Sequence, residues 1–353
     1  MTSTAKKYDV SVYIGRFQIF HNGQLALLRR ALDAAPVCIV VLGSAHQART
    51  PKNPFNWQER AEMIRLALPE ADRSRLRFLP VRDYYDQLRW VSAVRQGVAG
   101  LEDVNEATSL VLVGHFKDAT SEYLKNFPGW ALDAADSQGR IDSSSLRDAY
   151  FGSAGHSLEA ALAAMVSQIP ASTTDFLRAW AALPYFNELA QEWDNLRHEK
   201  ARWAGSPYAP VFVTVDAVVR CGDRVLLIQR GRAPGKGLYA VPGGFLEQRE
   251  TVYQSALREL EEETGLSLPE ADMQEAFKAV RVFDHPDRSL RGRVITHAHF
   301  FDLDSRFLPA VQAADDAAGA EWMPIEKLAS MEDQFHDDHF HMLDFFFSLT
   351  ARH

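Results

Sequence analysis

The chain has 353 residues, of which 46% are hydrophobic and 24% are charged, and its formal net charge is −9 at pH 7. This length predicts two domains of ordinary globular composition, and the negative charge argues against a nucleic-acid or membrane-surface partner. The two cysteines, Cys38 and Cys221, lie beside strand-like apolar residues, which favours buried reduced thiols over a disulfide framework. We predict no signal peptide or membrane-spanning run and expect a cytoplasmic enzyme.

The first 170 residues alternate between strand-like and helical stretches. A strand-like run over residues 8–14 is followed by the turn GRFQIFHNGQ and a helical stretch, a succession typical of a phosphate-binding corner. Further strand-like runs cover residues 37–42, 76–81 and 109–113. The alternation predicts an α/β domain with a parallel, Rossmann-like sheet.

Four segments of this domain carry a recognisable order of residues. They are GRFQIFHNGQ (15–24), ARTPKNPFNWQER (48–60), GHFKDATSEYLKNFPGW (114–130) and IDSSSLR (141–147). In the same order, they resemble the signature segments of the archaeal-type nicotinamide mononucleotide (NMN) adenylyltransferases. The resemblance implies transfer of an adenylyl group from ATP to NMN, which yields NAD and pyrophosphate, with Mg²⁺ accompanying the triphosphate.

The resemblance also implies roles for individual residues. His21 takes the place of the first of two family histidines that contact the ATP phosphates, Gln24 replaces the second, and Arg147 holds the triphosphate. Trp90 lies where the family has a tryptophan near the nicotinamide ring, and Asp142 departs from a family serine. The residues implied in substrate binding are Gly15, Arg16, Phe17, Gln18, Arg49, Asn53, Trp90, Lys117, Asp118 and Ser144.

Gln24 is the clearest departure from the family pattern. Glutamine keeps hydrogen-bonding capacity but carries no charge and cannot titrate, and charge-assisted hydrogen bonds are roughly twice as strong as neutral ones. The substitution therefore predicts a weakened adenylyltransferase. Compensation by Arg16 or Lys117 is the alternative.

Residues 171–206 predict a helical connector. Aromatic residues and leucines recur there at three- and four-residue spacing, which indicates an amphipathic helix interrupted at Pro184. The sequence Gly205-Ser206-Pro207 then marks a boundary. We therefore expect three parts: a nucleotidylyltransferase domain over 1–170, the connector over 171–206, and a second domain over 207–353.

The second domain begins with strand-like runs over residues 211–219 and 224–230 and then reaches a glutamate-rich helix. Thr251 and Gln254 form a capping box at the start of this helix, and Gly265 is a natural stop. Glu259, Glu262 and Glu263 fall on one face, where like charges repel. A bridging cation relieves the repulsion, and oxygen ligation suits Mg²⁺ or Mn²⁺. A solvated acidic helix face is the alternative.

Residues 244–266 match every fixed position of the Nudix box, Gx5Ex7REUxEExGU. The domain resembles the ADP-ribose pyrophosphatase branch of the Nudix family, which has an α/β/α fold and is fused to the adenylyltransferase in bifunctional proteins of NAD metabolism. The resemblance implies that Arg258 orients the carboxylates through an ion pair, with Glu250 as a candidate partner. The general base stays open between Glu263 and an acidic residue of a downstream loop. The implied metal ligands are the Gly244 carbonyl, Glu259, Glu262 and Glu263.

Four arginines, Arg281, Arg288, Arg291 and Arg293, follow the Nudix box. They form either a solvated loop or a cationic wall for a diphosphate, and we assign Arg291 and Arg293 to substrate binding. The leading hypothesis is a bifunctional enzyme that makes NAD from ATP and NMN and hydrolyses ADP-ribose to AMP and ribose 5-phosphate. The alternative is a hydrolase of another nucleoside diphosphate derivative whose first domain binds nucleotides as a sensor. The oligomeric state is left open, with a homo-oligomer as one alternative.

Overall fold

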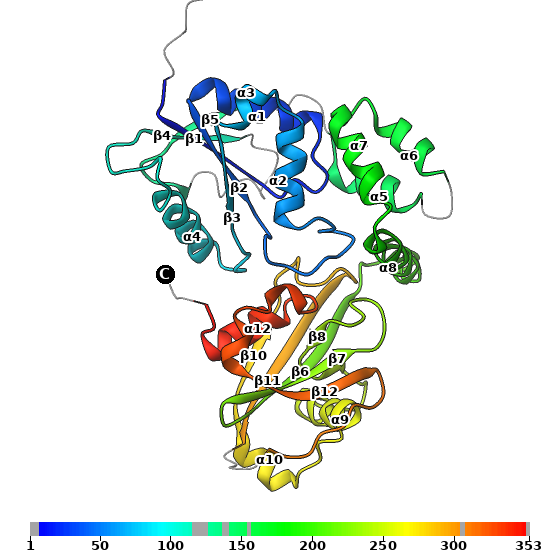
Figure 1. The fold of residues 1–353 in the computed structure, drawn as a ribbon. Helices are drawn as coiled ribbons and strands as arrows, with labels where there is room; N and C mark the ends of the chain where they lie inside the picture. Colours follow the sequence, from blue (N-terminus) through cyan, green and yellow to red (C-terminus); the bar gives the residue numbers. More distant parts are fainter. Residues whose placement is uncertain (1–6, 115–125, 136–140, 154–156, 304–307, 351–353) are drawn as a thin grey trace, which may run out of the picture. The chain divides into compact units, whose positions relative to one another are not determined.

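The computed structural model describes residues 7–114, 126–135, 141–153, 157–303 and 308–350. The chain divides into two compact units, Met1–Gln191 and Glu192–Arg352, and each is treated by itself (Figure 1). In the described part of the chain, no helix combines the length and apolar character needed to cross a membrane. The division falls inside the helix over residues 184–201, within the stretch predicted as a connector.

The first unit is built on a five-stranded parallel sheet with the order β3-β2-β1-β4-β5. This confirms the predicted Rossmann-like sheet. The central strands are almost wholly buried, as expected for a sheet with both faces covered. The strands are β1 (Val10–Gly15), β2 (Val37–Leu42), β3 (Leu76–Pro80), β4 (Leu110–Gly114) and β5 (Ala131–Ala134).

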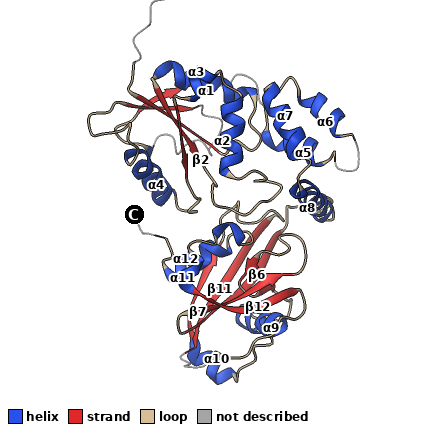
Figure 2. Ribbon diagram, viewed as in Figure 1, coloured by secondary structure: helices blue, strands red, loops and turns tan. Residues whose placement is uncertain are grey.

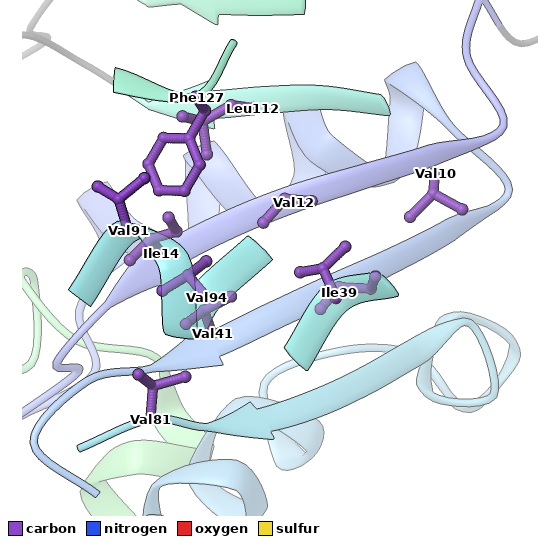
Figure 3. Packing of buried hydrophobic residues seen from close by; sticks show 11 residues of the cluster. Val10, Val12, Ile14, Ile39, Val41, Val81, Val91, Val94, Leu112 and Phe127 are labelled. Atoms are coloured by element: carbon purple, nitrogen blue, oxygen red, sulfur yellow. The ribbon is translucent and has the colours of Figure 1, made fainter. Parts of the chain in front are cut away.

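Apolar packing holds one helix against this sheet. Val91 and Val94 of one helix face lie against alternate residues of β1, including Val12 and Ile14 (Figure 3). Val98 of the same helix belongs to the same buried cluster. Spacings of three and four residues on the helix and two on the strand produce these matching apolar faces. The helices of the central fold are α1 (Asn22–Ala34), α2 (Trp57–Leu66), α3 (Glu70–Arg73) and α4 (Gln87–Ala99).

Helices predominate between β5 and the second unit (Figure 2). Tyr150 donates a hydrogen bond from its hydroxyl to the carbonyl of Leu177 at 2.8 Å. This bond joins the helix over residues 143–151 to the helix over residues 171–180. The predicted interruption at Pro184 is confirmed, since one helix ends at Trp180 and the next begins with the proline. These helices are α5 (Ser143–Phe151), α6 (Leu158–Met165), α7 (Ala171–Trp180) and α8 (Pro184–Ala201).

The second unit has a mixed sheet with the order β10-β11-β6-β7-β12, to which β8 and β9 add by pairing with β7 and β6. β6 and β11 are parallel, whereas the other pairs are antiparallel. The first two strands of this unit form a hairpin that turns at Gly222, whose φ of 60° favours glycine. The strands are β6 (Val211–Cys221), β7 (Arg224–Arg230), β8 (Tyr239–Ala240), β9 (Gly243–Phe245), β10 (Phe277–Phe283), β11 (Arg293–Leu303) and β12 (Ala317–Pro324).

Helices cover both faces of this sheet. Ala217 and Val219 of β6 belong to a core that contains Leu260 from one helix, whereas Val218 faces a second core that contains Leu343 from another. Alternating residues of β6 thus pack into two cores, one on each face of the sheet. The predicted α/β/α Nudix arrangement is confirmed. The helices are α9 (Val252–Thr264), α10 (Glu270–Ala276), α11 (Ile325–Leu328) and α12 (His339–Phe347), with a 3-10 turn, η2 (Glu332–Gln334).

Candidate functional site

The turn between β1 and α1 forms the first candidate site. His21 caps α1, and its Nδ1 accepts a hydrogen bond from the backbone N–H of Gln24 at 3.3 Å. An accepting Nδ1 places the ring proton of neutral histidine on Nε2, which can then donate to a phosphate. The dipole of the helix start favours an anion at the same place.

Gln24 has a structural role that the sequence interpretation missed. Its Oε1 accepts a hydrogen bond from the backbone N–H of His21 at 3.2 Å, which completes a capping box. The sequence contained a signal for this capping box, because Gln24 follows the capping residue His21 by three positions, at the third residue of the helix. The residue that departs from the family pattern therefore stabilises the start of α1.

Two arginines supply positive charge beside this turn. Burial, followed by the neighbouring charge of Arg16, lowers the pKa of Arg147 to about 10. Arg147 donates to the carbonyl of Gln18 and, at 3.2 Å, to the hydroxyl of Ser144. Asp142 caps α5 by accepting from the backbone N–H groups of Ser144 and Ser145. Four residues of the predicted set, Arg16, Gln18, Ser144 and Arg147, are thus brought together.

Other predicted substrate residues are engaged by the protein. The side-chain amide of Gln18 is buried and exchanges two hydrogen bonds with the backbone of Phe55. Arg49 forms a two-bond ion pair with Glu59, at 2.6 and 3.0 Å, and its guanidinium lies 4.4 Å from the ring centre of Tyr185. These contacts fix the positions of both side chains before any ligand binds.

The remaining predicted residues of the first unit differ in their surroundings. The Nδ2 group of Asn53 donates to Gln47 at 2.7 Å, while its buried Oδ1 makes no hydrogen bond. Trp90 lies on α4 against the core, 6.2 Å from the ring of Phe127. Gly15 is required because an added Cβ would lie 2.7 Å from the ring of Phe17. Two further predicted positions, Lys117 and Asp118, lie outside the described residues.

Arg60 is a residue that sequence reasoning missed. Its side chain is fully buried, and it donates to the carbonyls of Arg16 and Gly43 at 2.7 Å and to that of Ser44 at 3.2 Å. Burial lowers the pKa of Arg60 to about 10. It joins the turns after β1 and β2, and its only sequence signal is its place at the end of the segment over residues 48–60.

The second candidate site surrounds the start and face of α9. The predicted capping box of Thr251 and Gln254 is present, and Gly265 ends the helix in the left-handed conformation. Arg258 forms ion pairs with Glu250 at 3.0 Å, Glu259 at 3.0 Å and Glu262 at 2.7 Å. The predicted pairing with Glu250 is therefore present, and Arg258 also neutralises two other carboxylates of the box.

Glu263 faces the sheet from the same helix. It is buried and accepts a hydrogen bond from the backbone N–H of Gly243 at 2.9 Å. Burial, with the nearby charge of Glu259, raises the pKa of Glu263 to about 8. The pKa of Glu259 is also raised, first by its own burial. The protein thus holds two neighbouring carboxylates in surroundings that disfavour their charge.

These groups suit a divalent cation. A Cβ on Gly244 would lie 2.3 Å from Oε1 of Glu259, so only glycine brings this backbone so close to the carboxylate. Carboxylate and carbonyl oxygens are the donors that hard cations prefer, and a cation would favour the charged glutamates. In this conformation Arg258 engages two of the implied metal ligands, Glu259 and Glu262, and the described residues contain no ready-made group of three His, Cys, Asp or Glu ligands.

The four downstream arginines do not form a common wall. Arg288 is buried in a two-bond ion pair with Asp338, at 2.9 and 2.7 Å, which is a structural role. Arg281 lies over the ring of Phe345, and Arg293 donates to the carbonyl of Asp284. Arg291 alone among the four lies over Phe245, the residue that follows Gly244.

Arg230, at the end of β7, is a second residue that was missed. Burial, followed by the charge of Arg291, lowers the pKa of Arg230, whereas Asp337 and Glu263 act in the opposite direction. Arg230 therefore lies close enough to Arg291 and Glu263 to interact with both. A pair of arginines beside the glutamates suits a diphosphate. The sequence alone gave no reason to group Arg230 with Glu263 and Arg291, because these residues lie far apart along the chain.

Comparison with known proteins finds relatives for each of the two units. A NUDIX domain model matches residues 210–346, and a Cytidylyltransferase-like model matches residues 12–94. A nicotinamide/nicotinic acid mononucleotide adenylyltransferase of Acinetobacter baylyi is 34% identical over 53% of this chain and 94% of its own length. An ADP-ribose pyrophosphatase of Methanocaldococcus jannaschii is 37% identical over 34% of this chain and 65% of its own length.

One crystal structure matches the chain from end to end. It is a bifunctional NMN adenylyltransferase/ADP ribose pyrophosphatase from Francisella tularensis, 32% identical, with a TM-score of 0.86 over 97% of this chain and 99% of its own. The same protein complexed with AMP and a manganese ion gives a TM-score of 0.87 at 31% identity. A match of this extent covers both units, and the chain belongs to the family of bifunctional NMN adenylyltransferase/ADP-ribose pyrophosphatases.

Proposed function

We propose that the chain catalyses two reactions of NAD metabolism. The first unit transfers an adenylyl group from ATP to NMN and releases NAD and pyrophosphate. The second unit hydrolyses ADP-ribose to AMP and ribose 5-phosphate with Mg²⁺ or Mn²⁺. The observation that carries the proposal is the end-to-end similarity to the Francisella enzyme. We also propose that the chain has three parts: a nucleotidylyltransferase domain over 1–170, a connector over 171–206 and a hydrolase domain over 207–353.

In the first unit, positioning and charge stabilisation supply the catalysis. The NMN phosphate attacks the α-phosphorus of ATP in line, and the bond to pyrophosphate breaks. The start of α1 and the Nε2 proton of His21 face the phosphates, while Arg16 and Arg147 offset the charge that develops on them. Gln24 contributes no charge, and we therefore expect slow transfer beside efficient hydrolysis.

In the second unit, Glu259, Glu262, Glu263 and the Gly244 carbonyl would hold the cation, which supplies positive charge to neutralise and orient the diphosphate oxygens. Arg258 keeps the carboxylates in place, and the N–H of Gly243 orients Glu263. Arg230 and Arg291 supply further positive charge for the anionic substrate. Water attacks one phosphorus, and the general base stays open between Glu263 and another acidic residue.

A second candidate function keeps the hydrolase and makes the first unit a nucleotide sensor. The one observation that favours it is Gln24, which is uncharged and engaged in the helix cap. The compartment is proposed to be the cytoplasm. Cys38 and Cys221 are both buried thiols, as expected in a reducing compartment.

Product chromatography tests the proposal. The purified chain is incubated with Mg²⁺ and either ADP-ribose or ATP plus NMN. We expect AMP and ribose 5-phosphate from the first mixture and a slower appearance of NAD and pyrophosphate from the second. Hydrolysis without any NAD would support the sensor, and failure to hydrolyse ADP-ribose while another nucleoside diphosphate derivative is cleaved would refute the assigned substrate.

A further inference from the structure

The loop between β7 and β8, residues 231–238, holds the side chain of Arg230 from one side of its guanidinium group. Nε of Arg230 donates a hydrogen bond to the carbonyl of Pro234 at 2.9 Å. The two terminal nitrogens of the same group make no hydrogen bond to any residue that the structure describes. A guanidinium that is bonded through Nε alone keeps its terminal donors for an anion.

A carboxylate binds the same peptide group of this loop. The backbone N–H of Gly235, which shares a peptide group with the carbonyl of Pro234, donates to Oε2 of Glu192 at 3.0 Å. Because this peptide group is planar and rigid, Glu192, the peptide and Arg230 form one chain of hydrogen bonds. Hydrogen bonds in a chain polarise one another, so the carboxylate makes the carbonyl a stronger acceptor for Arg230.

The shared peptide group also lies against a buried histidine. Gly235 has a φ of 74°, and a Cβ added to it would lie 2.2 Å from Nδ1 of His336. His336 is itself held, because its backbone N–H donates to the carbonyl of Tyr239 at 2.9 Å. Only glycine allows so close an approach in this backbone conformation. Contacts with both His336 and Glu192 therefore fix the position of the peptide group.

Glu192 lies on α8, before the segment that the NUDIX domain model matches, and it is the first residue of the second unit. Burial raises the pKa of Glu192, whereas the hydrogen bond from Gly235 and the charge of Arg230 act in the opposite direction. A carboxylate in such surroundings is costly unless it is hydrogen-bonded and lies near a cation. The loop and Arg230 meet these two needs.

We propose that Glu192 is a positioning residue for the hydrolase: it holds the peptide group between Pro234 and Gly235, which orients Arg230 to bind the diphosphate of the substrate. The proposal rests on the hydrolase function and extends its site to a helix outside the Nudix box. Arg230 lies close enough to Glu263 for their charges to interact, so an anion bound to Arg230 also lies near the glutamates.

A double-mutant cycle in the full-length chain tests this role. In Glu192→Ala, we expect the KM for ADP-ribose to rise about 2- to 10-fold, the value of one ordinary hydrogen bond, with kcat retained. Arg230→Ala should raise the KM about 10- to 150-fold, the value of a hydrogen bond to a charged group. When Arg230 is already alanine, Glu192→Ala should change the KM by less than about twofold, because the residue through which Glu192 acts is absent.

Two further variants separate the hydrogen bond from a general effect on the helix. Glu192→Gln keeps an oxygen that can accept from Gly235 but loses the charge, so its KM should lie between those of wild type and Glu192→Ala. Glu188→Ala removes an exposed carboxylate one turn earlier on α8 and should leave the KM unchanged. If Glu192→Ala behaves like Glu188→Ala, or if the effects of Glu192→Ala and Arg230→Ala are additive, the proposal is wrong.

A binding measurement separates this proposal from the assigned reaction. The probe is the methylene analogue of ADP-ribose, in which carbon replaces the bridging oxygen of the diphosphate, and calorimetry with Mg²⁺ gives its Kd without turnover. We expect Glu192→Ala to weaken binding when Arg230 is present and to have no effect when Arg230 is alanine. Absence of this dependence overturns the positioning role even if ADP-ribose is hydrolysed, whereas its presence in a chain that leaves ADP-ribose intact refutes only the assigned reaction.

Discussion

The buried carboxyl of Glu263 links hydrolysis to stability. Its pKa is raised from 4.5 to about 8, chiefly by burial. Between these values the folded protein binds more protons than the unfolded chain, so the free energy of unfolding falls as pH rises from 4.5 towards 8. One pKa unit corresponds to about 1.4 kcal/mol, which sets the cost at pH 7 at roughly 3 kcal/mol in the absence of a cation.

Glu263→Gln removes this cost and keeps an oxygen that can accept from the N–H of Gly243. In chelator, we expect the variant to be more stable than wild type by up to about 3 kcal/mol at pH 7 and by less at pH 5. Hydrolysis should fall by orders of magnitude, because a cation ligand has been lost. Mg²⁺ should stabilise the wild type and have little effect on the variant.

Urea unfolding at pH 5, 6, 7 and 8 measures the effect, and the relevant transition is the one that Mg²⁺ shifts in the wild type. Glu261→Gln is the control, since Glu261 is exposed on the same helix and loses the same charge. A Glu263→Gln variant whose stability has the wild-type dependence on pH would refute the reasoning, as would one that keeps near wild-type hydrolysis with Mg²⁺.

Three further predictions follow from the two sites. Glu262→Gln should lower ADP-ribose hydrolysis by orders of magnitude in a steady-state assay and leave NAD formation unchanged; near wild-type turnover would contradict the cation site. Gln24→His should raise the adenylyltransferase kcat about 10- to 150-fold and, by disturbing the cap of α1, lower the free energy of unfolding by about 1 kcal/mol; an unchanged or lower kcat would contradict the role given to Gln24. The fragment 207–353 should fold and hydrolyse ADP-ribose, and a folded but inert fragment would show that the two units depend on each other.

Features determined by local sequence were predictable. The capping box was expected from the three-residue spacing between Thr251 and Gln254, and the end of the helix was expected from the single residue Gly265. Both features are present, with Gly265 in the left-handed conformation. The parallel sheet followed from alternating strand-like and helical stretches. In each case the determining interaction joins residues close in the chain or repeats with the period of the element, so a single sequence contains it.

Features that depend on long-range contacts were not predictable. Arg60 reaches carbonyls 44 and 17 residues away, and nothing in its neighbourhood indicates that it is buried. Arg288 forms an ion pair with Asp338, which lies 50 residues away in the sequence. Arg288, which was a candidate phosphate ligand, therefore has a structural role. Arg258 was expected to orient the carboxylates, but the sequence could not show that it binds three of them in this conformation.

The central claim is that one chain carries two separate active sites. Its most direct test is to measure both reactions, by chromatography of products, in wild type, in His21→Ala and in Glu262→Gln. We predict that His21→Ala loses NAD formation and keeps ADP-ribose hydrolysis, and that Glu262→Gln shows the opposite pattern. Loss of both reactions in either correctly folded variant, or retention of both, would contradict the account.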